Sequence, residues 1–430
     1  MLGKLHKGAI ETVKRMIMVV SILFLLLSTL AFNGFVVVKG ETQEVGFIIK
    51  MSVTYSNNNE TENWTFTEED RAISLFMNNT WQTVQLINHS YPLEKTTFDE
   101  DDGNPIAILQ FPESELKPGE NVSYTVTYYA LSEPRLLPPP NINEDYSGTL
   151  EEIPEELKET YCREGDPWLV NDPELRDLAQ NVAENETKVL TVVKKFVEWI
   201  EQNINYPAQV HELPLYPNET YAELRGDCDD QAILFITLCR IYGIPAYLQV
   251  GCMYLPTYFD DHQYWNGHVR SVLKRVGWHG WAMVYVPPWR WLPVDLTYAL
   301  GGYSDPLNAI KTAAVTSKIT LQYMNISQMD YVASARKDMD FLKSNDFSVY
   351  MQDEMMEAPP TNHRDDTFER LFPWILMFAT VVVAVTAAGI FVRVWKKEKL
   401  KKLESKNLSL AFRAWQSAVL FKFPFQPVFC

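Results

Sequence analysis

Alternating apolar and polar residues mark the first third of the chain. Every second residue from Val45 to Tyr55 is apolar, and the alternation returns from Val122 to Ala130 after a Lys117-Pro118-Gly119 turn. Period-two alternation in short runs, separated by turn residues, is typical of strands that are buried on one face. We therefore expect residues 40–135 to fold as an all-β sandwich domain.

The apolar spacing changes to that of helices beyond a Pro-rich linker at 136–150. A stripe from Val189 to Ile200 predicts a helix that faces a core, and a nearly unbroken apolar run from Ala232 to Tyr242, closed by Gly243, predicts a buried helix. An α+β domain is therefore expected at 151–345, followed by an acidic stalk at 346–370. Within it we expect strands at 246–254, 279–286, 291–295 and 318–324, a loop at 255–267 and a helix at 329–342.

Two stretches without any charged residue, Met16–Val38 and Leu371–Val392, are each long enough for a helix that crosses a bilayer. Basic residues flank the outer end of both, so the positive-inside rule places both chain ends in the cytoplasm. The expected layout has a membrane helix within residues 1–38, a second at 371–394 and a basic cytoplasmic tail at 395–430. A cleaved signal peptide is the alternative for the first stretch, because Thr29-Leu30-Ala31 is a passable cleavage site.

Glycosylation triplets agree with this topology. Eight Asn-x-Ser/Thr triplets lie between the two charge-free stretches, and one, at Asn407, lies beyond them. The bias favours an extracellular glycoprotein held at the cell membrane. The eight asparagines are Asn59, Asn63, Asn78, Asn88, Asn121, Asn185, Asn218 and Asn325.

The acidic charge is concentrated between the two expected membrane helices. The whole chain has a net charge of −17, but residues 39–370 hold 25 of its 38 basic residues and 52 of its 55 acidic residues. So strong a negative charge argues against nucleic acid as the main partner. The expected partners are a peptide or protein substrate and the lipid bilayer.

A cysteine, Cys228, stands where a Gly226-Asp227 turn meets the start of the buried helix. Unpaired backbone N–H groups and the positive end of the helix dipole favour a thiolate there and would stabilise an oxyanion formed at that sulfur. Asp227, as helix N-cap, and Asp229 and Asp230 oppose the thiolate by their negative charge. We expect the helix end and a protonated imidazole to outweigh them, which makes Cys228 a candidate nucleophile.

A histidine and an aspartate are expected to meet at the open end of a hairpin. His279 and Asp295 are each eight residues from Pro287, which lies in the turn between the two predicted strands. Their side chains should be close enough for the carboxylate to accept a hydrogen bond from the imidazole. The alternative interpretations are a buried core cysteine at Cys228, a satisfied core histidine at His279 and a strand-end cap at Asp295.

These motifs, in this order, resemble the core of the transglutaminase-like superfamily of cysteine acyl-transfer enzymes. The resemblance covers roughly residues 150–320, with Gly280 and Leu296 standing where the family commonly has Ala and Pro. It is carried by Gly226 and Cys228, by Gly243-Ile244-Pro245, by His279 and Trp281, and by Asp295 and Thr297.

The resemblance implies a papain-like α+β core that acts on amide bonds. Cys228 would be the nucleophile, His279 the general base and Asp295 the carboxylate that orients it, with Trp281 and Asp227 beside the substrate groove. Water as acceptor would make a protease or amidase, and an amine would make a cross-linking transglutaminase. A catalytically inactive surface module that binds peptides or cell-envelope components is the alternative.

No cofactor or metal is expected. The acidic turn at 99–103 lacks the spacing of an EF-hand and is better explained as a solvated hairpin turn. Cys239 is expected to be a buried core residue. If a disulfide forms, the expected pair is Cys162 with Cys252.

Overall fold

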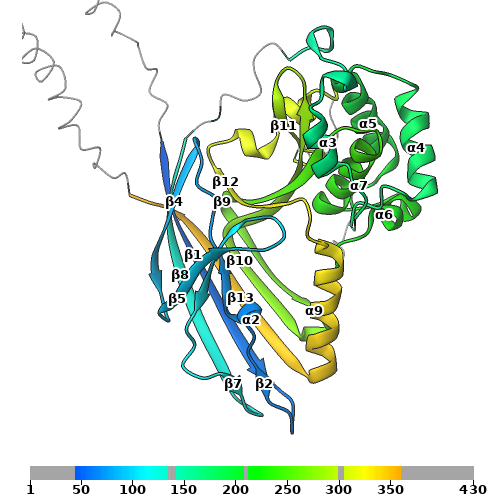
Figure 1. Cartoon of the computed structure of the whole chain (residues 1–430). Coiled ribbons are helices and arrows are strands. Elements are labelled where there is room, and N and C mark those ends of the chain that lie inside the picture. The colour runs from blue at the N-terminus through cyan, green and yellow to red at the C-terminus, as the bar shows by residue number, and fades with distance from the viewer. Residues whose placement is uncertain are drawn as a thin grey trace, which may run out of the picture. The chain divides into compact units, whose positions relative to one another are not determined.

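The fold is described from a computed structural model (Figure 1). The described residues are 44–133, 135, 142–165, 167–207, 212–298 and 305–359. The two charge-free stretches and the basic tail lie outside these ranges. Within the ranges, no helix is both long enough and apolar enough to cross a membrane.

One large sheet organises the described chain (Figure 1). It contains β1 (Val45–Asn57), β4 (Gln82–His89), β8 (Asn121–Ser132), β9 (Ala246–Tyr264), β10 (Val269–Val286), β11 (Arg290–Val294), β12 (Thr320–Ile326) and β13 (Phe347–Glu357). The strand order is β12–β9–β10–β13–β1–β8–β4, with β11 paired to β10. The β10–β13 pair is parallel and the other pairs are antiparallel.

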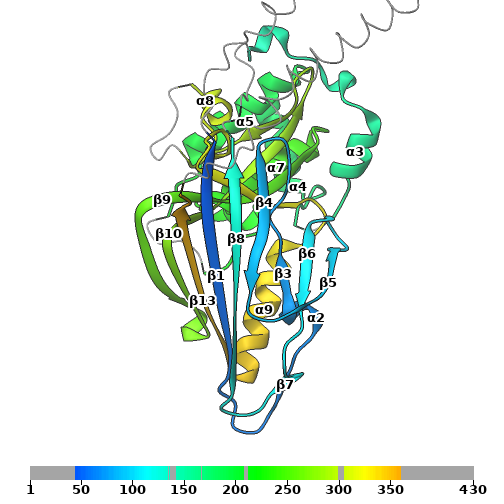
Figure 2. The same cartoon turned by 90° about the vertical axis from the view of Figure 1, so that its left-hand side faces the viewer.

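The first third of the chain is rich in strands, as its period-two pattern predicts. Alternate residues of β8 from Val122 to Ala130 are buried. Two small sheets lie beside the large one (Figure 2). One pairs β2 (Trp64–Thr65) with β7 (Glu115–Leu116), and the other has the order β3 (Ala72–Ser74), β6 (Pro105–Leu109), β5 (Leu93–Phe98), with the short helix α2 (Glu68–Arg71) before β3.

This β-rich region differs from the separate sandwich expected at 40–135. β1 pairs with β8 on one side and with β13 on the other, so the large sheet continues into the later part of the chain. The apolar core beneath β1 and β8 also includes Cys252, Leu321 and Phe347, which come from β9, β12 and β13. Burial of these side chains therefore joins the two regions into one folded body.

The expected stalk at 346–370 also needs correction. Phe347–Glu357 form β13, which lies between β10 and β1 in the middle of the large sheet. Phe347 and Met355 are buried in the same core as β1. This part of the acidic stretch therefore joins the sheet instead of spacing the enzyme from a membrane.

The second half of the expected linker at 136–150 packs against the α+β region. Ile142 and Ser147 are buried. The Gly148 N–H donates to the Pro287 carbonyl, and the Gly148 carbonyl accepts from the Val189 N–H. Residues 142–150 are thus a docked segment, while 136–141 lie outside the described residues.

Helices pack around the part of the sheet formed by β9, β10 and β11 (Figure 1). They are α3 (Glu155–Tyr161), α4 (Pro173–Ala183), α5 (Val189–Asn203), α6 (Pro217–Glu223), α7 (Cys228–Ile241) and α8 (Asn308–Lys311), while α9 (Tyr331–Asn345) packs against β13. The helices predicted from Val189 to Ile200 and from Ala232 to Tyr242 are confirmed, as α5 and α7. Their apolar residues share one core with β9, β10 and β11, which fixes the start of α7 against the sheet.

Two expected loops have more structure than their composition predicts. Residues 255–264 continue β9, and 259–264 pair with β10, where a loop at 255–267 is expected from the sequence. The acidic turn at 99–103 does connect the β5–β6 hairpin. Asp102 also links that turn to the segment after β12, since its Oδ1 accepts hydrogen bonds at 2.8 Å from the Ser327 and Gln328 backbone N–H groups.

Candidate active site

The start of α7 is shaped by Gly226 and Asp230. An added Cβ at Gly226 would lie 2.6 Å from the Asp230 Cβ and 3.0 Å from a Thr220 methyl, so the tight approach requires glycine. Asp227 is the N-cap, as predicted, and its N–H donates to Asp230 Oδ2 at 3.1 Å. Asp230 is fully buried and also accepts from the Leu215 N–H at 2.7 Å, so its role is to fix the turn before Cys228.

His279 and Asp295 meet at the end of the β10–β11 hairpin, as their spacing predicts. His279 Nε2 lies 2.9 Å from Asp295 Oδ1 and 3.0 Å from Oδ2, and both side chains are buried. Asp295 Oδ2 also accepts from the Ala314 N–H at 2.8 Å, and Oδ1 accepts from the Tyr298 N–H at 3.1 Å. Because the carboxylate accepts from Nε2–H, the other ring nitrogen, Nδ1, is left as the proton acceptor.

Strand β10 brings the residue after His279 against the nucleophile candidate. The backbone N–H groups of Gly280 and Asp229 lie close enough to the Cys228 sulfur to lower the pKa of its thiol. An added Cβ at Gly280 would lie 3.4 Å from the Asp229 Cβ, an ordinary contact. The start of α7 therefore lies against β10 beside the residue that follows His279.

The charge around the sulfur differs from the sequence expectation. Burial raises the pKa of the Cys228 thiol well above its usual value, and the nearby Asp229 and Asp227 carboxylates raise it further. The backbone hydrogen bonds from Gly280 and Asp229 lower that pKa, but by less. Burial and the acidic residues therefore outweigh the helix end, and they favour the thiol over the thiolate at Cys228.

Asp227 and Asp229 form a hydrogen-bonded acid pair next to Cys228. Burial raises the pKa of Asp227 to about 10, and the hydrogen bond to Asp229 and its negative charge raise it too. With that pKa, the Asp227 carboxyl group carries a proton at neutral pH. Asp227 Oδ1 has no hydrogen-bond partner and is shielded from solvent.

One group of side chains among the described residues is compact enough to hold a cation. Carboxylate oxygens of Asp227 and Asp229 and the Cys228 sulfur all lie within 4.8 Å of one another. Acidic groups often cluster in this way without an ion, so the proximity of these atoms by itself assigns no metal.

The match to a known family covers the segment that carries this geometry. Residues 176–296 match the model of the transglutaminase-like superfamily, which includes Cys228, His279 and Asp295. This segment is a transglutaminase-like domain. The resemblance expected from the motifs is thus confirmed over these residues. No curated protein matches the chain.

Solved structures with similar folds have low sequence identity to the chain. One, from Cytophaga hutchinsonii and described as a candidate cysteine protease, is 15% identical, with a TM-score of 0.46; the match covers 74% of this chain and 92% of that one. The periplasmic domain of TgpA from Pseudomonas aeruginosa, bound to ethylmercury, is 14% identical, with a TM-score of 0.28, covering 65% of this chain and 95% of that one. At these TM-scores we draw no functional conclusion from either.

Trp281, expected beside the substrate groove, lies inside the transglutaminase-like domain instead. Its side chain is 0% exposed, and its Nε1 donates to Gln249 Oε1 at 3.2 Å. It packs over Gly251, where an added Cβ would lie 2.6 Å from the indole ring. Trp281 thus supports the strand that carries His279 and does not line a groove.

The expected disulfide is wrong. Cys162, Cys228, Cys239 and Cys252 are all free thiols. Cys252 is buried in the core beneath β1, whereas Cys162 follows the end of α3 and is only half-buried. Cys239 is fully buried, as predicted for a core residue.

Sequence reasoning missed two tyrosines at this site. The negative charge of Asp229 and burial raise the pKa of Tyr331, which lies at the start of α9, well above its usual value. Burial raises the pKa of Tyr206, and the nearby Asp227 and Asp229 raise it further. Neither residue lies in a motif, so no signal in the sequence pointed to them.

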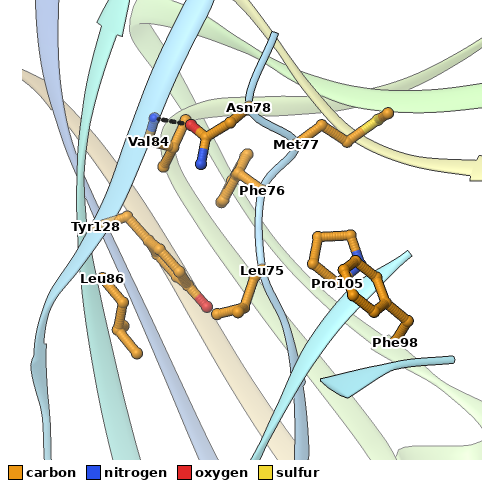
Figure 3. Close-up of a pocket in the computed structure, with 9 residues that line it drawn as sticks. All are labelled: Leu75, Phe76, Met77, Asn78, Val84, Leu86, Phe98, Pro105 and Tyr128. Atoms are coloured by element: carbon orange, nitrogen blue, oxygen red, sulfur yellow. Dashed lines mark hydrogen bonds between the residues drawn. The ribbon is translucent and has the colours of Figure 1, made fainter. Parts of the chain in front are cut away.

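A separate cavity lies in the β-rich region (Figure 3). Its volume is about 400 Å³, and its lining is mostly apolar. It is lined by Leu75, Phe76, Met77, Asn78, Val84, Leu86, Phe98, Pro105 and Tyr128. None of these residues belongs to the candidate active site, and we assign the cavity no role in its chemistry.

Proposed function

We propose that the protein is a cysteine-dependent acyl-transfer enzyme that cleaves or exchanges amide bonds through Cys228, His279 and Asp295. The observation that carries this proposal is the buried His279–Asp295 hydrogen bond, and a cysteine in the first turn of α7, which packs on the same strand β10, supports it. The match of residues 176–296 to the transglutaminase-like superfamily supports the same chemistry.

The reaction would begin with transfer of the thiol proton. Cys228 Sγ gives its proton to His279 Nδ1 and attacks the amide carbonyl carbon, while Asp295 stabilises the imidazolium that forms. The developing oxyanion accepts from the Cys228 backbone N–H at the positive end of α7. The C–N bond then breaks, the departing amine takes the proton from His279, and the acyl group stays on sulfur as a thioester.

The second half of the reaction decides the enzyme class. Water that attacks the thioester gives a carboxylic acid and makes the enzyme a protease or amidase, whereas a primary amine gives a new amide and makes it a transglutaminase. In both cases His279 takes a proton from the attacking group and Cys228 leaves as the thiol.

A mass-spectrometric assay tests this function. The purified protein is incubated with a peptide mixture, and separately with a glutamine peptide and a labelled amine. We expect hydrolysis or amine incorporation, lost in Cys228→Ala and reduced by about 10⁴ in Asp295→Asn, where the wrong imidazole tautomer is held. Product formation that survives Cys228→Ala would refute the proposal.

Absence of any product with intact wild-type protein would favour the inactive peptide-binding module. That alternative has one supporting observation, the raised pKa of Cys228, because a thiol held neutral is a weaker nucleophile. Binding of the same peptides without turnover, measured by calorimetry, would identify it.

We also propose that the charge-free stretches 16–38 and 371–392 anchor the protein with residues 39–370 outside the cytoplasm. Six triplet asparagines that are exposed support access to glycosylation: Asn63, Asn78, Asn88, Asn121, Asn185 and Asn218. Asn325 is unsuited, because its side chain accepts from Gln249 Nε2 at 2.7 Å within the sheet.

Protease added to intact cells tests the topology. It should digest the middle of the chain and spare the basic tail at 395–430, which an antibody to that tail detects. Loss of the tail under this treatment would exclude a cytoplasmic C-terminus.

A further inference from the structure

The buried Trp281 lies beside the proposed general base. Both side chains point to the same face of β10, because they are two residues apart on one strand. The centroids of the Trp281 and His279 rings are 5.9 Å apart, and the ring planes are tilted by 37°. In the pairing with β9, Trp281 is opposite Gln249 and His279 is opposite Gly251. Because Gly251 has no side chain, the indole extends over it towards His279.

One side-chain amide holds the indole in this place. Trp281 Nε1 donates to Gln249 Oε1 at 3.2 Å, and Gln249 Nε2 donates to Asn325 Oδ1 at 2.7 Å. Gln249 Oε1 also accepts from Gln322 Nε2. A rotation of this amide by half a turn would set its N–H groups against those of Trp281 and Gln322. The three partners therefore leave Gln249 one orientation, in which its oxygen faces the indole.

Gln322 links this amide to the β-rich region. Gln82, the first residue of β4, accepts from the Gln322 backbone N–H at 2.8 Å and donates to the Gln322 carbonyl at 2.7 Å. β4 and β12 are the two ends of the strand order of the large sheet, so this one side chain joins them. Gln82, Gln249 and Gln322 are all buried. A buried amide that loses a partner is costly, so the three side chains fix one another.

We propose that Gln249 is a positioning residue, which holds the Trp281 indole against the His279 imidazole and is itself fixed by Gln322. Its importance for catalysis rests on the proposed function. With the indole on one side and Asp295 Oδ1 at 2.9 Å from Nε2, the imidazole keeps the orientation in which Nδ1 is the proton acceptor. Without the Gln249 oxygen, the buried indole N–H would lack an acceptor. The indole would then shift, and the imidazole would lose its neighbour on β10.

Carbethoxylation of His279 measures the effect without any substrate. The full-length protein is treated briefly with diethyl pyrocarbonate near neutral pH, digested with trypsin and analysed by mass spectrometry. Cleavage after Arg275 and Arg290 releases residues 276–290, in which His279 is the one histidine. His268, which directly precedes β10 and is half-buried, is the internal reference for unfolding of this strand. Because the test needs neither the cysteine nor turnover, its failure is distinct from failure of the proposed function.

Gln249→Met keeps the length of the side chain and removes the oxygen that accepts from the indole. We expect it to speed carbethoxylation of His279 about fivefold, the factor that corresponds to one lost hydrogen bond, and to leave His268 unchanged. Gln322→Met removes the amide that fixes Gln249 and should give a smaller rise. In Trp281→Phe, which has no indole N–H, adding Gln249→Met should bring no further rise.

Asn57→Ala is the matched control. Asn57 is also a buried amide of the large sheet, and its Nδ2 donates to the Glu62 and Leu116 carbonyls, so it has no contact with the three glutamines. The carbethoxylation rate of His279 in this variant should equal that of the wild type. A general loss of stability is thereby separated from the release of the indole.

Where the amide assay gives product, Gln249→Met should also lower kcat about fivefold and leave KM unchanged, because Gln249 and Trp281 are buried and do not meet the substrate. A higher KM with an unchanged kcat would overturn the proposal. It is also overturned if the His279 rate in Gln249→Met equals that of the wild type, if Asn57→Ala speeds it equally, or if the rise persists undiminished with Trp281→Phe. Should Gln249→Met fail to fold, an unchanged rate in Gln322→Met would overturn it.

Discussion

Two glycines at the active site differ in the space that they leave. At Gly226 an added methyl would lie 2.6 Å from the buried Asp230 and 3.0 Å from Thr220, whereas at Gly280 it would make ordinary contacts at 3.4 Å. We expect Gly226→Ala to lower the free energy of unfolding by about 1–3 kcal/mol and Gly280→Ala to change it by less than about 1 kcal/mol. Urea unfolding of both variants checks this, and equal losses would contradict it.

The sequence is informative about single residues where a motif carries them. The turn before Cys228 and the hairpin spacing of His279 and Asp295 predict their neighbourhood correctly, because both depend on short stretches of chain. The sequence does not predict whether the sulfur is ionised. The burial of Asp227 and the proximity of Tyr331 to Asp229 depend on how elements that are distant in the sequence pack together. The sequence therefore predicts the proximity of residues more accurately than it predicts their ionisation.

At the scale of elements, β13 is a strand whose sequence is typical of an acidic stalk. Its alternate residues Phe347, Val349, Met351, Asp353 and Met355 have the period of a strand, but an aspartate occupies a position on the core side. Asp353 is buried, and Trp278 Nε1 donates to its Oδ2 at 2.8 Å. A buried carboxylate with a partner on a neighbouring strand cannot be distinguished by pattern from an acidic surface.

The buried Asp353 predicts a pH-dependent stability. Burial raises its pKa to about 6, so the folded state binds this proton more tightly than the unfolded chain does. Its charge therefore destabilises the fold above about pH 6, and that cost disappears as the pH falls to about 4. We expect Asp353→Asn, which keeps an acceptor for Trp278, to stabilise the protein by about 2 kcal/mol at pH 8 and by almost nothing at pH 4.

Urea unfolding at pH 4, 6 and 8 measures this effect. Asp261→Asn is a control on the same sheet, because Asp261 is exposed and pairs with Arg270 at 2.7 Å. Asp261→Asn should not raise the free energy of unfolding at pH 8. A gain for Asp353→Asn that is independent of pH would show that its cause is packing and not the carboxylate charge.

At the scale of the described chain, the candidate site depends on contacts between two regions that the sequence pattern predicts to be separate domains. The period-two and helical patterns change on either side of residue 136, which predicted two domains. Pairing between distant strands is invisible to such local patterns, and here β13 returns to lie between β10 and β1. β10 carries His279 and is therefore braced by a strand from the C-terminal side of the transglutaminase-like domain.

Hydrogen exchange tests whether this body unfolds as one unit. Because β1 and β10 share β13 as a neighbour, and the core beneath β1 contains residues of β9, β10, β12 and β13, their amides should exchange with the same free energy of opening in low denaturant. Amides of β5, whose residues are all exposed, should open at lower cost and serve as the internal reference. If β1 and β8 open together at a distinctly lower free energy while β9 and β10 stay protected, the β-rich region is an independent unit after all. In that case β13 is a weak junction, and His279 is held without its help.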